Sequence, residues 1–230
     1  MIKQRIDIVD FHSHILPCAD HGSTSLEMSI AQLRHAAKRG MTRVLATPHF
    51  YPMNDSVDSF LARRRDSFTL LSSALDSSLP EVKVGAEVMI CNGIDRLPDI
   101  EKLFIGGTRA ILMELPLNDD FQLEYADAVY RLTSDDVTVI LAHPERYSAS
   151  SVECMLDSGA VLQCNASAIV NLARYRRAYR WIENGSVVAL GSDIHCNDAS
   201  AYNNFVKAID KLGKYSEYIK VNTDFIWDCM

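Results

Sequence analysis

Two histidines near the N-terminus, His12 and His14, are separated by one residue and follow a short apolar run. Side chains two residues apart point to the same side of an extended backbone, so both imidazoles can reach one ion. A single pair is a weak signal, because two such histidines can equally be hydrogen-bonded structural residues. Whether this pair belongs to a metal centre therefore depends on the other polar residues that could join it.

The same residue types recur after other apolar runs of the chain, and Asp193 and His195 form a second pair with the same spacing. The full set of polar residues at the ends of these runs is His12, His14, His49, Glu87, Glu114, His143, Asn165, Asp193 and His195. So many imidazoles and carboxylates exceed the needs of one ion and predict two or three divalent metals, with Mn, Fe or Zn suited to such mixed ligands. Bridged metals lower the pKa of bound water and can hold a phosphate for attack.

Apolar, β-branched runs alternate with amphipathic stretches, as is typical of βα units around a parallel sheet. The predicted strands are 6–11, 43–47, 82–88, 110–115, 137–142, 161–165 and 187–192. The predicted helices are 25–39, 56–78, 122–134, 151–158, 168–184 and 199–211. In a closed parallel barrel the carboxyl ends of the strands meet on one face, so seven strands would bring these polar groups together.

The composition indicates one globular domain over residues 1–230, with 48% hydrophobic and 23% charged residues. A net charge of -7 disfavours a nucleic-acid partner and a membrane-surface role. The six cysteines include no Cys-x-x-Cys pair, and none is followed six positions later by arginine, which argues against a cysteine-dependent phosphatase. With no apolar leader and no apolar run long enough to span a membrane, we expect a cytoplasmic protein without membrane insertion.

Taken in order, the motifs around the polar residues resemble a known superfamily. They are His12-Ser13-His14, Thr47-Pro48-His49, Gly85-Ala86-Glu87, Glu114-Leu115-Pro116, His143-Pro144-Glu145-Arg146-Tyr147 and Ser192-Asp193-Ile194-His195. This ordered set looks like the polymerase and histidinol phosphatase (PHP) superfamily. Within it, the set is most similar to the bacterial metal-dependent protein-tyrosine phosphatases of capsular and exopolysaccharide synthesis. The resemblance runs from residue 6 to 197.

The resemblance implies a distorted (β/α)7 TIM-like barrel with three metals at the carboxyl ends of the strands. It assigns the first metal to His12, His14, Glu87 and Asp193, the second to Glu87, Glu114 and His143, and the third to His21, His49 and His195. It implies that Arg146 contacts phosphate, which suits a guanidinium, and that Arg146, Asp193 and His195 are the catalytic residues. The implied reaction is attack of a metal-bridging hydroxide on phosphorus without a phosphoenzyme.

The resemblance also implies manganese as the favoured metal, a phosphotyrosine protein as substrate and a polysaccharide-synthesis tyrosine kinase as that substrate. A homo-oligomer stays open. Two positions depart from the pattern: His21 stands where this branch usually has aspartate, and Ser200 stands where relatives carry a second phosphate-contacting arginine. These departures keep a second enzyme open, a small-molecule phosphatase of the histidinol-phosphate type. A catalytically silent, metal-bound regulatory protein is the alternative from another class.

Several polar residues have simpler interpretations. His35 lies within a predicted helix and is left out of the site, and Asp20 is interpreted as a loop-capping or supporting carboxylate. Asn165 could contact substrate or cap a turn. The arginine-rich stretch at 174–180 is more simply a solvated helix face than a second phosphate-binding group, and the role of residues 221–230 stays open.

Overall fold

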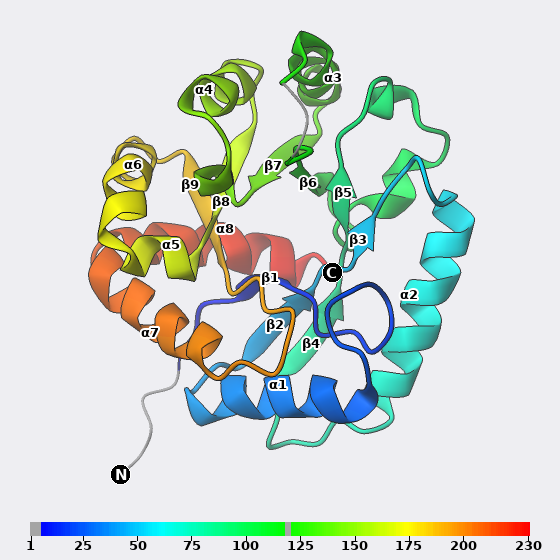
Figure 1. The fold of residues 1–230 in the computed structure, drawn as a ribbon, viewed down its shortest axis with the longest axis vertical. Coiled ribbons are helices and arrows are strands. Elements are labelled where there is room, and N and C mark those ends of the chain that lie inside the picture. The colour runs from blue at the N-terminus through cyan, green and yellow to red at the C-terminus, as the bar shows by residue number, and fades with distance from the viewer. Residues whose placement is uncertain (1–5, 118–120) are drawn as a thin grey trace.

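The computed structural model describes residues 6–117 and 121–230, with strands at the centre and helices around them (Figure 1). The strands are β1 (Asp10–Ser13), β2 (Arg43–Ala46), β3 (His49–Phe50), β4 (Glu81–Val84), β5 (Glu87–Met89), β6 (Ala110–Glu114), β7 (Thr138–Ala142), β8 (Val161–Asn165) and β9 (Val187–Gly191). The helices are α1 (Leu26–Lys38), α2 (Val57–Ser72), α3 (Leu123–Ser134), α4 (Ala149–Asp157), α5 (Ala166–Val170), α6 (Leu172–Glu183), α7 (Ser200–Leu212) and α8 (Tyr215–Asp228). Short 3₁₀ turns are η1 (Ile94–Arg96), η2 (Ile100–Leu103) and η3 (Pro144–Arg146).

The strands form two sheets in which every pair of neighbours is parallel. One sheet has the order β1-β2-β4 and the other the order β3-β5-β6-β7-β8-β9. Most residues of these strands are buried, and β6 and β9 are buried along their whole length, which is expected when helices cover a parallel sheet. The predicted alternation of strands and helices is thus confirmed as a mixed α/β fold with parallel sheets.

One predicted strand is divided into two, and another is followed by a strand that was not predicted. The 82–88 prediction becomes β4 and β5 on either side of Gly85 and Ala86, whereas the 43–47 prediction becomes β2, and β3 follows it after Thr47 and Pro48. Pro48 has no backbone N–H to donate, but its carbonyl still accepts from Glu87 N at 3.1 Å. The break therefore leaves His49 and Glu87 opposite each other in the register of β3 and β5.

The expected closed barrel is not shown: the structure has two parallel sheets instead. The first predicted strand also lies later in the chain than expected, since β1 begins at Asp10 and contains His12. Next to β1 runs the segment after β9, where Asp193 N donates to His12 O at 2.8 Å and His14 N donates to Ile194 O at 3.1 Å. These bonds bring the two pairs of candidate ligands side by side.

The helices begin where side chains can cap them. Ser25, Ser56 and Ser148 each accept a hydrogen bond from a backbone N–H in the first turn of α1, α2 and α4. The predicted helix at 168–184 is instead split, because the Asn171 side chain accepts from Ala173 N and begins α6 as a new helix. No helix within the described ranges is long and apolar enough to cross a membrane.

The sequence did not predict α8, and it forms part of the core. A group of buried residues on the strands packs together with Ile226 and Trp227 of this helix. Its strand and turn members include Val9, Phe11, Leu45, Ile105, Ala110, Leu112, Ile140, Ala142, Val188 and Ala189. In Figure 1 α8 passes behind the strands. The C-terminal segment thus docks on the strands. The sequence alone had left the role of residues 221–230 open.

Candidate metal centre

The nine predicted ligands come from seven places in the fold. His12 lies in β1 and His14 follows it, His49 and Glu87 begin β3 and β5, and Glu114 ends β6. His143 directly follows β7, whereas Asp193 and His195 follow β9 and His21 lies between β1 and α1. His12, His14, Glu87 and His143 are fully buried, so these ionisable groups occupy an interior position that only a compensating partner would make favourable.

Four of the predicted ligands converge on one point. His12 Nε2 and His14 Nε2 are 3.1 Å apart, and Glu87 Oε2 lies 3.1 Å from the first and 3.2 Å from the second. Asp193 Oδ1 is 3.6 Å from His12 Nε2 and 3.4 Å from His14 Nε2. This arrangement brings together the set that the resemblance assigns to a first metal.

Glu87 also faces a second group of ligands with its other oxygen. Glu87 Oε1 lies 2.7 Å from His143 Nε2, and His143 Nε2 is 3.7 Å from Glu114 Oε2. One carboxylate therefore presents one oxygen to the His12 and His14 pair and the other to His143. A carboxylate with two oxygens directed at two ligand groups has the form required of a metal bridge.

The third predicted set is brought together less completely. The rings of His21 and His49 stack at 4.7 Å between centroids, and His195 lies 4.8 Å from His21. Yet the ligand atoms within 4.8 Å of one another belong to His14, His49 and His195, while His21 is an exposed member of the ring stack. His49 Nδ1 faces Glu114 Oε1 at 2.9 Å, so His49 also joins the neighbouring group.

Two residues that orient the histidines were not predicted from the sequence. Gln163 Oε1 accepts from His12 Nδ1 at 2.7 Å, and the Tyr147 hydroxyl is 2.9 Å from His143 Nδ1. The supporting role expected of Asp20 matches its contact with His14 Nδ1 at 2.7 Å. Partners of this kind fix the ring so that Nε2 faces the metal. A polar residue inside an apolar strand, as Gln163 is in β8, was the available signal.

Two glycines let the backbone approach the ligands closely. A Cβ on Gly22 would lie 2.4 Å from His14 Cβ, and a Cβ on Gly191 would lie 2.5 Å from His12 Cβ. His143 and Asp193 themselves have positive φ angles of 34° and 52°. Non-glycine residues rarely adopt this backbone region, and they do so mainly where the surrounding structure holds a functional side chain in place.

Arg146 ends η3 and reaches the same group of residues. Its Nη2 donates to Asp193 Oδ2, which also accepts from Asn165 Nδ2 at 2.8 Å. Asn165 in turn accepts from Gln163 Nε2 at 3.1 Å, so a chain of hydrogen bonds connects Arg146 to the partner of His12. Ser200 is not part of this chain of hydrogen bonds. Its backbone N and side-chain Oγ both donate to Asp198, just before α7.

The electrostatic balance of the site favours cations. Burial opposes protonation of His12, but the charges of Glu87 and Asp193 outweigh it and raise the His12 pKa to about 9. Burial likewise opposes ionisation of Asp193, yet the neighbouring imidazoles and Arg146 hold its pKa well below the ordinary value. The buried carboxylates thus favour a positive charge on the neighbouring imidazoles. A metal cation bound between them could supply that charge in place of the protons.

The donor atoms fit divalent metals. Glu87 Oε2, Asp193 Oδ1 and His49 Nε2 are buried, and each lacks a hydrogen-bond partner among the residues that the structure describes. A buried polar atom without a partner is costly, and three of them directed into one cluster indicate a missing ligand. Imidazole nitrogens mixed with carboxylate oxygens suit Mn, Fe or Zn. His35 stays outside the cluster, as expected, and bonds Asn197 Oδ1 at 2.8 Å.

Known proteins resemble this chain over most of its length. The tyrosine-protein phosphatase YwqE of Bacillus subtilis is 27% identical over 82% of this chain and 77% of that protein. The tyrosine-protein phosphatase CpsB of Streptococcus pneumoniae is 24% identical over 84% of each. A solved structure from work on YwqE and CpsB, described as unique metal-dependent tyrosine phosphatases, matches with a TM-score of 0.78 at 20% identity, covering 97% of this chain and 95% of that one.

The TM-score supports the fold described above, which brings the predicted ligands to one place. A family model described as capsular polysaccharide synthesis, CpsB/CapC, matches residues 8–225. That span includes both halves of the ligand cluster, Arg146 and α8 up to residue 225. The chain therefore belongs to the CpsB/CapC family of capsular polysaccharide synthesis.

Proposed function

We propose that this chain is a metal-dependent protein-tyrosine phosphatase that hydrolyses phosphomonoesters. The observation that carries the proposal is Glu87, which directs one oxygen to His12 and His14 and the other to His143. Family membership and the activity named for YwqE and CpsB support the same conclusion. A pair of ligand groups joined by one carboxylate suits the binding of two metals a short distance apart, as many phosphate-hydrolysing sites require.

The proposal assigns the metals to the residues that the sequence indicated. His12, His14, Glu87 and Asp193 would hold the first ion; Glu87, Glu114 and His143 the second; and His21, His49 and His195 the third. We favour two or three divalent ions, with manganese ahead of iron or zinc. When bound, such ions lower the pKa of water and neutralise negative charge on the phosphate. The contact of His14 with His49 and His195 supports a compact cluster.

In the same proposal Arg146 binds the phosphate of the substrate. A guanidinium can form two parallel hydrogen bonds with phosphate oxygens, and charge strengthens each bond. Asp193 Oδ2 orients Arg146, and Asn165 Nδ2 donates to the same oxygen. His195, whose Nδ1 is 3.4 Å from Asp193 Oδ1, completes the catalytic set of Arg146, Asp193 and His195.

We further propose that the two sheets belong to one distorted (β/α)7 barrel and that residues 1–230 form one catalytic domain. The hydrogen bonds between β1 and the segment after β9, and those across the β2–β3 break, support this arrangement. The proposed substrate is a phosphotyrosine protein, with a cytoplasmic polysaccharide-synthesis tyrosine kinase as its candidate. Family membership is what supports that candidate.

A substrate comparison tests the proposal. The purified protein, loaded with Mn, is assayed on a phosphotyrosyl peptide and on histidinol phosphate. We expect a higher kcat/KM on the peptide and loss of both activities in His12→Ala. Preference for histidinol phosphate would favour a small-molecule phosphatase, which Ser200 keeps open. A metal-loaded protein that hydrolyses neither these compounds nor p-nitrophenyl phosphate would overturn the proposal and favour a regulatory protein.

A further inference from the structure

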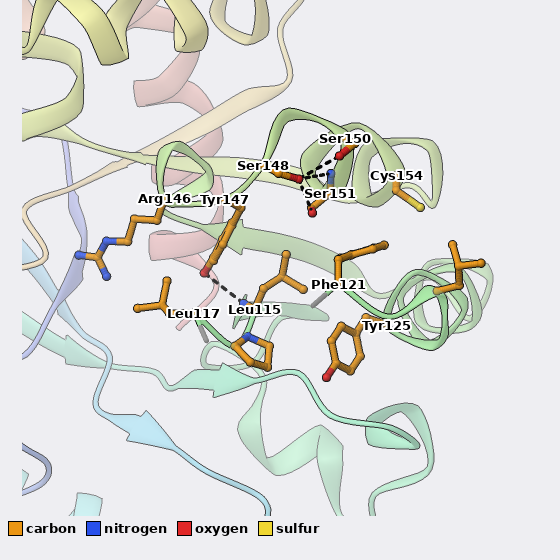
Figure 2. Close-up of a pocket in the computed structure, with 12 residues that line it drawn as sticks. Leu115, Leu117, Phe121, Tyr125, Arg146, Tyr147, Ser148, Ser150, Ser151 and Cys154 are labelled. Carbon is orange, nitrogen blue, oxygen red and sulfur yellow. Dashed lines mark hydrogen bonds between the residues drawn. The ribbon is translucent and has the colours of Figure 1, made fainter. Parts of the chain in front are cut away.

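A cavity of about 590 Å³, whose lining mixes apolar and polar surface, lies beside the candidate metal centre. Its described lining residues follow β6 and begin α3 on one side and belong to η3 and the start of α4 on the other, and we call it the β6–β7 cavity (Figure 2). Its walls include Leu115, Phe121, Tyr125, Tyr147 and Cys154. The metal-binding prediction makes no use of these side chains apart from Tyr147, so the cavity needs an explanation of its own.

Tyr147 separates the cavity from the ligand cluster. Its hydroxyl lies 2.9 Å from His143 Nδ1 and accepts from Leu115 N at 3.1 Å, so both polar contacts face the site and the strand end. The ring is buried and is left to form part of the cavity wall. One side chain thus contacts the proposed metal ligand His143 and any molecule bound in the cavity.

Arg146 connects the cavity to the place where phosphate would bind. It lines one end of the cavity, while its guanidinium extends away from Phe121, Tyr125 and Cys154 at the other end (Figure 2). That guanidinium contacts Asp193. A molecule whose phosphate meets Arg146 could therefore extend its remaining part into the β6–β7 cavity.

The lining favours an uncharged group over a charged one, and its leucines and aromatic rings offer apolar contacts. Among the described residues that line the cavity, Arg146 is the one with a formal charge, and its charge is directed out of the cavity. The serines at the upper edge are used by the start of α4, since Ser148 Oγ accepts from Ser151 N at 3.0 Å and lies 3.0 Å from Ser150 Oγ. A second phosphate would therefore meet no further cation among the described lining residues.

The rim and the volume favour a peptide over an isolated tyrosine ring. Leu117 and Leu123 on the rim are 58% and 70% exposed, and a chain lying across them would remove apolar surface from water. The volume falls in the range of about 300–1,000 Å³ that is typical of sites for ligands larger than one side chain. The cavity therefore has room beyond that needed by the phosphorylated residue.

We propose that the β6–β7 cavity binds an apolar side chain next to the phosphotyrosine of a peptide substrate and thereby sets sequence preference. The inference rests on the proposed phosphatase function. It predicts that peptides with leucine near the phosphotyrosine are better substrates than the same peptides with alanine. The preference would act mainly through KM, because the contact is made away from the reacting phosphorus.

The test uses the Mn-loaded protein and phosphotyrosyl peptides in which leucine replaces alanine at each position on either side of the phosphotyrosine. The variant Leu123→Asp introduces a charge at the rim, whereas Leu172→Asp is its matched control. Both leucines are exposed first residues of helices of 12 residues, so both changes have similar effects on a helix N-terminus. Cys154→Tyr offers a second way to reduce the cavity, by placing a ring in it.

We expect leucine at one position to raise kcat/KM about 10-fold, as one apolar contact can. Leu123→Asp and Cys154→Tyr should remove that gain, while Leu172→Asp keeps it and all three hydrolyse p-nitrophenyl phosphate at near the unmodified rate. Equal kcat/KM for all peptides, or equal loss in Leu172→Asp, would overturn the inference and leave the phosphatase function intact. No hydrolysis of any of these compounds by the unmodified protein would overturn both.

Discussion

The two ends of the parallel strands treat charge in different ways. At the amino ends, cationic side chains meet α8: Arg43 forms ion pairs with Asp7 and Asp224, and Lys83 Nζ donates to Trp227 O at 2.7 Å. At the carboxyl ends, Glu87 and Asp193 lie among imidazoles and keep buried oxygens without hydrogen-bond partners within the described chain. At the amino ends these charged side chains have partners within the chain, whereas the carboxyl ends gather atoms that could hold a metal ion.

The amino ends of the strands should therefore contribute mainly to stability, and the carboxyl ends mainly to function. Trp227 and Ile226 close the amino end with apolar surface, which contributes to folding whether or not metal is present. The carboxyl end places ionisable groups in a dry interior, which is unfavourable for folding and useful for binding metal. Changes at the two ends should therefore affect different measurements, and the predictions below test that separation.

The largest effect is expected from Glu87→Gln. The amide removes the charge that faces both ligand groups, so we expect the loss of more than one metal per chain. Hydrolysis of p-nitrophenyl phosphate should fall by about 10³-fold, since bound metals contribute several kcal/mol and about 1.4 kcal/mol corresponds to tenfold. Elemental analysis measures the metal content, and steady-state kinetics measure the rate of hydrolysis. Glu153→Gln, on the exposed face of α4, is the control; full metal content in Glu87→Gln would argue against a bridging role.

Trp227→Ala should act on stability and leave metal affinity unchanged. The ring is 4% exposed and lies 4.7 Å from Lys83 Nζ, so its removal opens a cavity under the strands and ends a cation–π contact. We expect a loss of about 3–5 kcal/mol in the free energy of unfolding, measured by urea denaturation. If metal content fell while stability stayed constant, the two ends would not be separable in this way.

Gln163→Leu should weaken metal binding without removing a ligand. The change deprives His12 Nδ1 of its acceptor and breaks the chain of contacts to Asn165. Loss of such a partner costs about 10–100-fold in metal affinity. Metal titration followed by calorimetry measures the change. Gln163→Glu keeps an oxygen for His12 and should restore most of the affinity, whereas equal affinities in all three proteins would show that Gln163 does not orient His12.

Asp224→Asn should give the smallest effect, with a defined pH dependence. Burial opposes ionisation of Asp224, but hydrogen bonds from Lys220 and Arg43 outweigh it and hold its pKa below the ordinary value. Stabilisation is then present above the unfolded pKa of about 3.9 and is lost as the pH falls through the lower folded value. We expect a loss of up to about 1 kcal/mol at neutral pH.

The Asp224→Asn comparison is made by urea unfolding in chelator, so that metal release does not contribute. Asp228→Asn, at an exposed position of the same helix, should match the unmodified protein throughout. The difference between Asp224→Asn and the unmodified protein should shrink as the medium becomes more acidic. A difference that grew with acidity would mean that the ion pairs of Asp224 do not stabilise the folded state.

The sequence predicted the α/β alternation well, because apolar runs in buried parallel strands are distinctive. His12, His14, Glu87 and His143 could be grouped since strand ends meet at one edge of a sheet. Local patterns gave no account of β3, which begins directly after Pro48, or of Asn171 using its side chain to start a new helix. Gln163 and Tyr147 were missed because their contacts with His12 and His143 depend on tertiary packing.

The C-terminal helix shows the same limit. Residues 215–228 combine charged and apolar side chains, and the partner of the apolar face is a set of strand residues distant in sequence. Trp227 is buried there while Phe225 is 70% exposed, a difference that no local pattern specifies. The grouping of His14 with His49 and His195, in place of His21, likewise depends on how the loops fold.

The most direct test of the metal centre combines metal content with reversible loss of activity. The protein is purified without chelator, its transition metals are counted, and hydrolysis of a phosphotyrosyl peptide is followed before chelation, after chelation and after Mn is returned. We predict more than one metal equivalent per chain, activity that disappears with chelation and returns with Mn, and no such return in His12→Ala. A metal-free protein that hydrolyses the peptide equally well in chelator would contradict the account.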